Sequence, residues 1–312
     1  MPTLVNVENF VRAETDRMFA SLAAGAGVNE WVHHREPAAI DDQRVIRENR
    51  DTLYSSAIVD LSGGATLSLP DAGDRYLSVM VVNNDHYINA VLHEPGDHEL
   101  TVERFDTDYV LVAVRILADP NYPADLGTVH ALQDQIELHA ASARPFVVPD
   151  YDSASFDATR DAILTLARGL SSFSGAFGKR DAVDPIKHLL GAAAGWGGLP
   201  AQEASYINVD PGFPLGEYEL TVSDVPVDGF WSISVYNADG YFQANDRNAY
   251  SLNNLTATPN PDGSFTVNFG ECGDDRPNCL PIVDGWNYAV RLYRPRPAIL
   301  DGTWTFPTAQ PA

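Results

Sequence analysis

The fold class of the C-terminal part of the chain follows first from FWSISVY at residues 230–236. Trp231, Ile233 and Val235 are apolar, and the residues between them carry hydroxyl groups. Because successive side chains of a β-strand point to opposite faces, this alternation predicts a strand with one face toward a core. The opposite face is then polar and either faces solvent or lines a pocket.

A second stretch, NYAVRLY at residues 287–293, has the same alternation. Tyr288, Val290 and Leu292 share its apolar face. Further short strands are expected at 218–222 and 264–269. The turn signals between these segments are Asp239-Gly240 and Pro261-Asp262-Gly263. Short strands with regular turns are typical of sandwiches and jelly rolls, so we predict a jelly-roll-like β-sandwich domain over residues 205–312.

The N-terminal part mixes strands with helices. Strands are expected at 53–61 and 65–69, and nearly continuous apolar, β-branched runs predict fully buried strands at 76–82 and 109–116. Helical spacing of apolar residues predicts a helix over 7–22. Thr128 is expected to cap another helix, whose apolar stripe is Val129, Leu132, Ile136 and Ala140. These elements predict a mixed α/β domain over residues 1–150.

A helical connection is expected to link the two domains, over residues 151–204. One helix is predicted at 156–170. A second begins at Asp184-Pro185, an N-cap residue followed by proline at the first helical position. The predicted fold class is therefore α+β and mostly β.

The charge of the chain limits its partners. It has 43 acidic and 20 basic residues, a formal net charge of −23, and only Lys179 and Lys187 are lysines. A surface this negative repels phosphate backbones and anionic lipid heads, so neither nucleic acid nor a membrane is expected as a partner. High solubility alone also explains the charge. Among the basic residues arginine dominates, and it suits bidentate recognition of carboxylates.

The cellular location is predicted from the N-terminal residues and from the length of the apolar runs, and the cysteine chemistry from the loop between the two cysteines. The first residues lack the basic and apolar regions of a signal peptide, and no run reaches the roughly 18 apolar residues of a membrane helix, so a cytoplasmic location is expected. Cys272 and Cys279 enclose a turn-rich loop. They form either a disulfide or two free thiols. Without neighbouring histidines they do not predict a zinc site, and no metal ligand is predicted elsewhere.

The densest polar cluster is RENRDTLYS at residues 47–55, where a loop enters a strand. The functional interpretation is a site for a carboxylate or another oxyanion, with Arg50 as the anion clamp and Tyr54 as donor or acid. The structural alternative is an Arg–Asp pair that fixes the entrance of the strand.

A second set of candidates lies on the polar faces of the predicted strands. Ser232, Ser234 and Tyr236 oppose the apolar face of one strand, and Arg291 with Tyr293 lies on the polar face of the other. Arg115 ends a buried strand, where sheet proteins often bind ligands, and an ion pair inside the fold is the equal alternative. The predicted catalytic residues are Asp51, Tyr54 and Tyr236. The predicted substrate-binding residues are Asn49, Arg50, Arg115, Trp231, Arg291 and Tyr293.

Several motifs resemble a tandem family. NRDTLYS at 49–55, VDL at 59–61 and DRY at 74–76 resemble the domain of unknown function 1254. Four further motifs resemble the domain of unknown function 1214: GFWSISVYNADGY at 229–241, NAYS at 248–251, RLYRP at 291–295 and DGTW at 301–304. The resemblance implies a mixed α/β part followed by a jelly-roll-like part. It implies no reaction, cofactor or catalytic residue, so the cofactor stays unknown.

Three hypotheses follow for the function. The first is an enzyme, hydrolase- or lyase-like, that acts on a small carboxylate- or carbonyl-bearing molecule at the junction of the two domains. The second is a non-catalytic protein that binds a small-molecule ligand. The third is an assembly protein in which the polar clusters are structural ion pairs, and a homodimer is an open option.

Overall fold

The computed structural model describes residues 1–43, 46–170, 172–273 and 276–312. The chain forms two compact units. The N-terminal unit comprises Met1–His34, Tyr54–Ile116 and His130–Ala201. The C-terminal unit comprises Arg35–Leu53, Leu117–Val129 and Gln202–Ala312. Strands make up 29% of the residues and helices 20%, which confirms the α+β, mostly β class.

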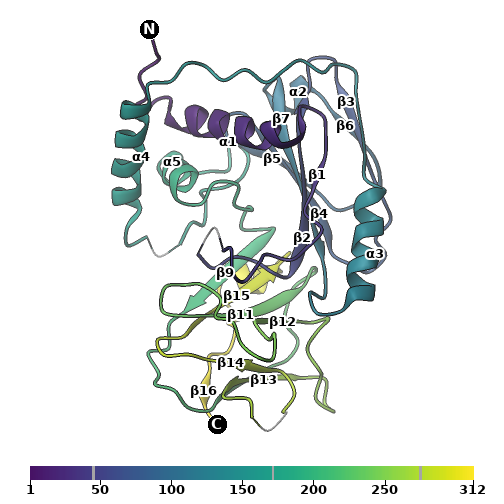
Figure 1. Cartoon of the computed structure of the whole chain (residues 1–312), viewed down its shortest axis with the longest axis vertical. Helices are drawn as coiled ribbons and strands as arrows, with labels where there is room; N and C mark the ends of the chain where they lie inside the picture. Colours follow the sequence, from purple (N-terminus) through teal and green to yellow (C-terminus); the bar gives the residue numbers. More distant parts are fainter. Residues whose placement is uncertain (44–45, 171, 274–275) are drawn as a thin grey trace. The chain divides into compact units, whose positions relative to one another are not determined.

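Two sheets carry the strands of the N-terminal unit (Figure 1). The five-stranded sheet has the order β1 (Val32–His33), β2 (Thr52–Asp60), β7 (Tyr109–Leu117), β4 (Leu77–Asn83), β5 (Ile88–Leu92). The three-stranded sheet has the order β6 (Gly96–Leu100), β3 (Ala65–Leu69), β8 (Glu137–Ala140). Every residue of β4 is buried, as its continuous apolar run predicts.

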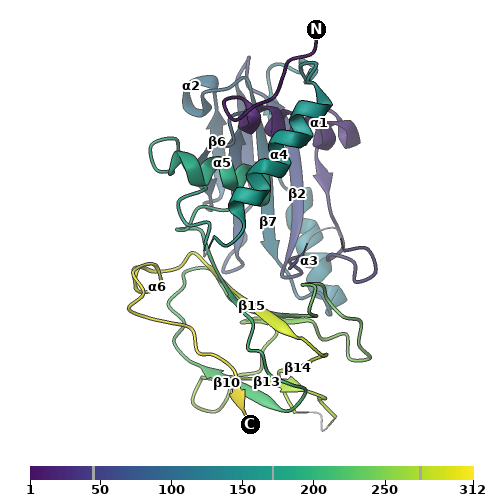
Figure 2. The same cartoon turned by 90° about the vertical axis from the view of Figure 1, so that its left-hand side faces the viewer.

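Three helices of this unit, α1 (Phe10–Ala26), α4 (Ser153–Ala167) and α5 (Pro185–Ala194), pack against one another. They lie together on one side of the five-stranded sheet (Figures 1 and 2). Their shared core includes Phe10, Ala13 and Phe156. The predicted start of α5 is confirmed, because the Asp184 carboxylate accepts from the backbone N–H groups of Ile186 and Lys187. The short helix α2 spans Val102–Phe105.

The helix predicted from Thr128 is wrong in its bounds. The observed helix α3 spans Pro123–Asp134, so Thr128 lies inside it and its hydroxyl donates to the carbonyl of Ala124. Ile136 follows the helix and Ala140 belongs to β8, where it pairs with Ala65 of β3. Strand pairing overrides the helical spacing of these apolar residues.

The C-terminal unit is a sandwich of two four-stranded sheets. One has the order β14 (Cys279–Pro281), β13 (Phe265–Gly270), β10 (Tyr218–Val222), β16 (Gln310–Pro311). The other has the order β12 (Ser251–Asn253), β11 (Trp231–Tyr236), β15 (Asn287–Tyr293), β9 (Ala204–Val209). The apolar faces of both sheets form one core, to which Leu220, Ile233, Val267 and Val290 belong. The short helix α6 spans Pro297–Leu300.

The two cysteines of this unit are bonded to each other, with their Cα atoms 5.7 Å apart. Of the two alternatives left open by the sequence, the disulfide is therefore the observed one. It closes a loop with a sequence separation of 7.

Candidate functional site

The polar face of β11 and β15 is buried. Ser232 and Ser234 have no exposed surface, and Arg291 is 4% exposed. The register places Arg291 of β15 directly opposite Ser232 of β11. Residues 47–51 of the same unit contact this face through the hydrogen bonds described below. The face that could have been a solvent-exposed surface is thus an interior surface.

Arg291 and Tyr236 hold the backbone of this segment. The Arg291 guanidinium donates to the Ser234 hydroxyl at 2.8 Å and to the Tyr236 oxygen at 2.7 Å. It also donates to the carbonyls of Arg47 and Glu48, at 2.8 and 3.1 Å. The Tyr236 hydroxyl itself donates to the Glu48 carbonyl at 2.9 Å. Both side chains therefore position the segment that carries the predicted cluster.

Asp51 is the buried carboxylate of this network, with no exposed surface. It accepts from the Ser232 hydroxyl at 2.7 Å and from the Asn253 amide at 3.4 Å, and the Arg291 Nη1 lies 4.0 Å away. Burial raises the pKa of Asp51 against the opposing effects of Arg291, Ser232 and Asn253. Burial alone would lower the pKa of Arg291, but the Tyr236, Asp51 and Tyr293 oxygens raise it, so the guanidinium stays charged.

Asn49 fixes the end of the same segment. Its side-chain Oδ1 accepts from the backbone N–H of Asp51 at 2.9 Å, a local turn that asparagine favours. Its amide donates to the Thr52 hydroxyl and to the Tyr293 hydroxyl, both at 3.2 Å. Together with Arg291 and Tyr236, Asn49 makes residues 47–52 a firmly held segment.

Arg50 differs from the other polar residues of the cluster. Its guanidinium lies 5.4 Å from the centroid of the Tyr250 ring, a cation–π contact. The side chain is half-buried, and it makes no hydrogen bond or ion pair with any residue that the structure describes. Burial lowers the pKa of Arg50, and the electrostatic effects of Tyr250, Glu48 and Asp51 oppose that effect only partly. Arg50 is therefore a partly desolvated cation without a bonded counterion.

The remaining predicted residues lie elsewhere. Tyr54 and Arg115 belong to the N-terminal unit, where the Arg115 guanidinium lies 5.5 Å from the Tyr54 ring centroid. Trp231 lies in the sandwich core, with its ring 5.3 Å from that of Phe265. The structure thus brings six of the predicted residues into one cluster: Asn49, Arg50, Asp51, Tyr236, Arg291 and Tyr293.

One member of the cluster, Asn253, was missed by the sequence analysis. It ends β12, a strand of three residues, which is too short to show the alternation that identifies a strand face.

Over the described residues, no group of three or more His, Cys, Asp or Glu side chains is arranged to hold a metal ion. In the same part of the chain, no helix combines the length and the apolar character needed to cross a membrane.

Family models match both parts of the chain. Residues 28–140 match the model of a protein of unknown function, DUF1254, and residues 214–297 match that of another, DUF1214. The order along the chain is the one that the sequence motifs predict. No curated protein matches the chain.

Two solved structures share the fold. The VPA0106 protein from Vibrio parahaemolyticus has a TM-score of 0.77 at 19% sequence identity, and the match covers 98% of this chain and 97% of that one. An uncharacterized protein from Burkholderia cenocepacia has a TM-score of 0.52 at 15% identity, over 93% of this chain and 84% of that one. At such identities the likeness shows the fold alone.

Proposed function

We propose that this chain, which carries the domains of unknown function 1254 and 1214 in tandem, binds a small organic carboxylate through Arg50. Neither domain brings an assigned activity. The observation that carries this proposal is the state of the Arg50 side chain. Its guanidinium lies over the Tyr250 ring, the side chain is half-buried, and it has no hydrogen-bond or ion-pair partner among the described residues. A guanidinium presents donors in a fork that matches a carboxylate.

The neighbours of Arg50 support this role because they hold the segment in place. Arg291 and Tyr236 bind the backbone of residues 47–48, and Asn49 binds that of Asp51. A binding residue on a segment held at both sides loses little conformational entropy when a ligand arrives. Electrostatics also favours an anion, because a carboxylate would supply the counterion that Arg50 lacks.

The geometry favours binding over catalysis, which is the non-catalytic alternative of the sequence analysis. Asp51 has no exposed surface, and its oxygens already accept from Ser232 and Asn253. The Tyr236 hydroxyl donates to one carbonyl and accepts from Arg291. We therefore assign Asp51, Tyr236 and Arg291 as positioning residues. A hydrolase or lyase activity with Asp51, Tyr54 or Tyr236 as catalytic groups stays a prediction.

The experiment is a thermal-shift screen of the full chain against small carboxylic acids, their amides and their methyl esters. A ligand at about 100 times its Kd stabilises a protein by roughly 2.7 kcal/mol. We expect an acid to raise the Tm of the wild type while its amide does not. Arg50→Gln should abolish the shift, and Arg50→Lys should weaken binding because it keeps the charge but loses the fork.

The matched control is Arg296→Gln, an arginine of the same unit whose partner is the exposed Asp228. This variant should respond to the acid like the wild type. The proposed function is contradicted if every acid that shifts the wild type shifts Arg50→Gln equally, or if a complete set of acids gives no shift.

A further inference from the structure

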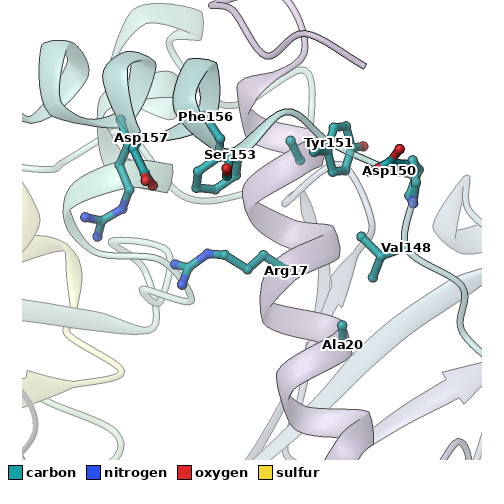
Figure 3. A pocket seen from close by; sticks show the side chains of 11 residues that line it. Arg17, Ala20, Val148, Asp150, Tyr151, Ser153, Phe156 and Asp157 are labelled. Atoms are coloured by element: carbon teal, nitrogen blue, oxygen red, sulfur yellow. The ribbon is translucent and has the colours of Figure 1, made fainter. Parts of the chain in front are cut away.

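A cavity of about 650 Å³ lies in the N-terminal unit, away from the predicted cluster in sequence. Its walls come from α1, from α4 and from the segment that precedes α4, as Figure 3 shows. The lining mixes apolar side chains, such as Ala20, Val148 and Phe156, with charged ones. This volume falls in the range of small-molecule sites, roughly 300–1,000 Å³.

Two arginines line the cavity and are held by one buried carboxylate. Glu14 of α1 is 2% exposed, and the Arg17 guanidinium donates to its two oxygens at 3.0 and 2.7 Å. The Nε of Arg160, from α4, lies 3.5 Å from the same carboxylate. Its Nη2 donates to the Ala193 carbonyl at 3.4 Å. Glu14 thus fixes one guanidinium from each of two helices.

Donors of both arginines are still available to a ligand. Neither Nη1 group makes a hydrogen bond with a residue that the structure describes. The Arg17 and Arg160 side chains are 52% and 37% exposed, so an acceptor that enters the cavity can reach their Nη1 groups. A carboxylate is the acceptor whose geometry and charge match two neighbouring guanidiniums.

A carboxylate and an aromatic ring lie next to the arginines. Asp157 raises the pKa of Arg17, although hydrogen bonding to Glu14 is the larger cause. In Figure 3 the Arg17 guanidinium extends toward the side of α4 that carries Asp157. Its carbon lies 5.7 Å from the Phe156 ring centroid. The Asp157 side chain is exposed and makes no ion pair or hydrogen bond with a described residue. It can therefore accept from an ammonium group.

We propose that this cavity binds a free α-amino acid with a large apolar side chain. Its carboxylate would accept from Arg17 and Arg160, and its ammonium would donate to Asp157. The side chain would pack on the Phe156 ring and on Val148 and Ala20. Opposite charges at adjacent positions, with an apolar wall beside them, match the α-amino acid group better than a simple acid or a simple amine. This site is independent of Arg50.

Isothermal titration calorimetry of the full chain with L-phenylalanine tests the proposal. We expect L-phenylalanine to bind, and both 3-phenylpropionate and phenethylamine to bind at least about tenfold more weakly, because each lacks one of the two charge-assisted contacts. Asp157→Asn should weaken L-phenylalanine at least about tenfold and leave 3-phenylpropionate nearly unchanged. Asp161→Asn, on the same helix, is the matched control and should bind like the wild type.

Two further variants establish whether L-phenylalanine occupies this cavity. Ala20→Phe fills the cavity without removing a charge, so it should abolish binding while the circular dichroism spectrum stays that of the wild type. Arg50→Gln should bind L-phenylalanine normally. The proposal is overturned if L-phenylalanine does not bind, if Asp157→Asn binds it as tightly as the wild type, or if Ala20→Phe still binds it. Each of these results leaves the role of Arg50 unaffected.

Discussion

Asp51 in the C-terminal unit and Asp60 in the N-terminal unit are both carboxylates without exposed surface that face an arginine, yet their pKa values move in opposite directions. Asp60 accepts from the Arg144 guanidinium at 3.0 and 3.3 Å, from its backbone N–H at 2.8 Å and from the Ser142 hydroxyl at 2.6 Å. Burial pushes its pKa upward, but these bonds outweigh burial and hold it well below its usual range.

Asp51 has fewer close donors. Arg291 divides its N–H groups among Ser234, Tyr236 and two backbone carbonyls, and its Nη1 stays 4.0 Å from the carboxylate. Burial therefore prevails at Asp51. The sign of a carboxylate's pKa shift therefore depends on the number of its close donors, more than on the presence of an arginine. Arg144 uses its guanidinium to bind the Asp60 carboxylate, whereas Arg291 uses its guanidinium to hold a backbone segment.

The largest expected effect comes from breaking the pair at Asp51. Arg291→Met should lower the free energy of unfolding by about 3–5 kcal/mol, because it leaves the buried Asp51 carboxylate without the cation that faces it and removes the guanidinium bonds to the Arg47 and Glu48 carbonyls. Urea denaturation at pH 7 measures this loss. Arg296→Gln removes the exposed pair with Asp228 and should cost no more than about 1 kcal/mol. A loss below about 1 kcal/mol for Arg291→Met would contradict the role given to Arg291.

The next effect tests the other side of the comparison. Asp60→Asn should cost about 2–3 kcal/mol at pH 7, because it removes the charge from bonds with Arg144 and Ser142. The folded pKa of Asp60 lies below its ordinary 3.8. Its stabilisation is therefore present above pH 3.8 and is lost as the pH falls toward the folded value. The free energies of unfolding of the wild type and of Asp60→Asn should therefore converge as the pH falls below 3.8. A difference between them that stays constant down to pH 2 would count against this account.

Asp51→Asn should show the opposite dependence on pH with a smaller effect, about 1 kcal/mol. The folded pKa of Asp51 is raised, so the folded state holds its proton more firmly than the unfolded state does. The contribution of Asp51 to stability is present below pH 3.8 and falls as the pH rises toward the folded pKa. The variant should therefore gain on the wild type as the pH rises from 4 to 7. If the wild type instead gains stability relative to Asp51→Asn over this pH range, the raised pKa of Asp51 is refuted.

The sequence predicts some of the longer strands well. β10 and β15 have the predicted bounds, because their side chains alternate between apolar and polar from one turn signal to the next. β1, β12, β14 and β16 were not predicted, since strands of two or three residues show no period, and the longer β5, β6, β8 and β9 were not predicted either. The helix predicted from Thr128 was extended into β8, where pairing with β3 determines the structure.

The burial of the polar face could not be predicted from the alternation. A period of two tells which side chains share a face, but it does not tell what covers that face. Asp51 meets Ser232 across a sequence separation of 181, and this contact arises only in the folded chain. For the same reason the sequence could not distinguish Arg291, whose donors are occupied, from Arg50, which makes no such bonds. Arg17 and Arg160 were missed because Glu14, which holds both, is one of several charged residues in α1 and nothing in the sequence distinguishes it.

The smallest stability effect is expected at Arg50 itself, and it separates a binding residue from a positioning residue. Arg50→Gln loses the contact with the Tyr250 ring, worth about 0.5–1 kcal/mol, but it also removes a partly desolvated cation. These effects oppose each other, so urea denaturation at pH 7 should show a change within about 1 kcal/mol. Arg291→Met, in contrast, disturbs the fold that presents Arg50. A loss above about 2 kcal/mol in Arg50→Gln would place Arg50 with Arg291 among the residues that hold the segment, and the carboxylate proposal would then lose the unpaired cation on which it depends.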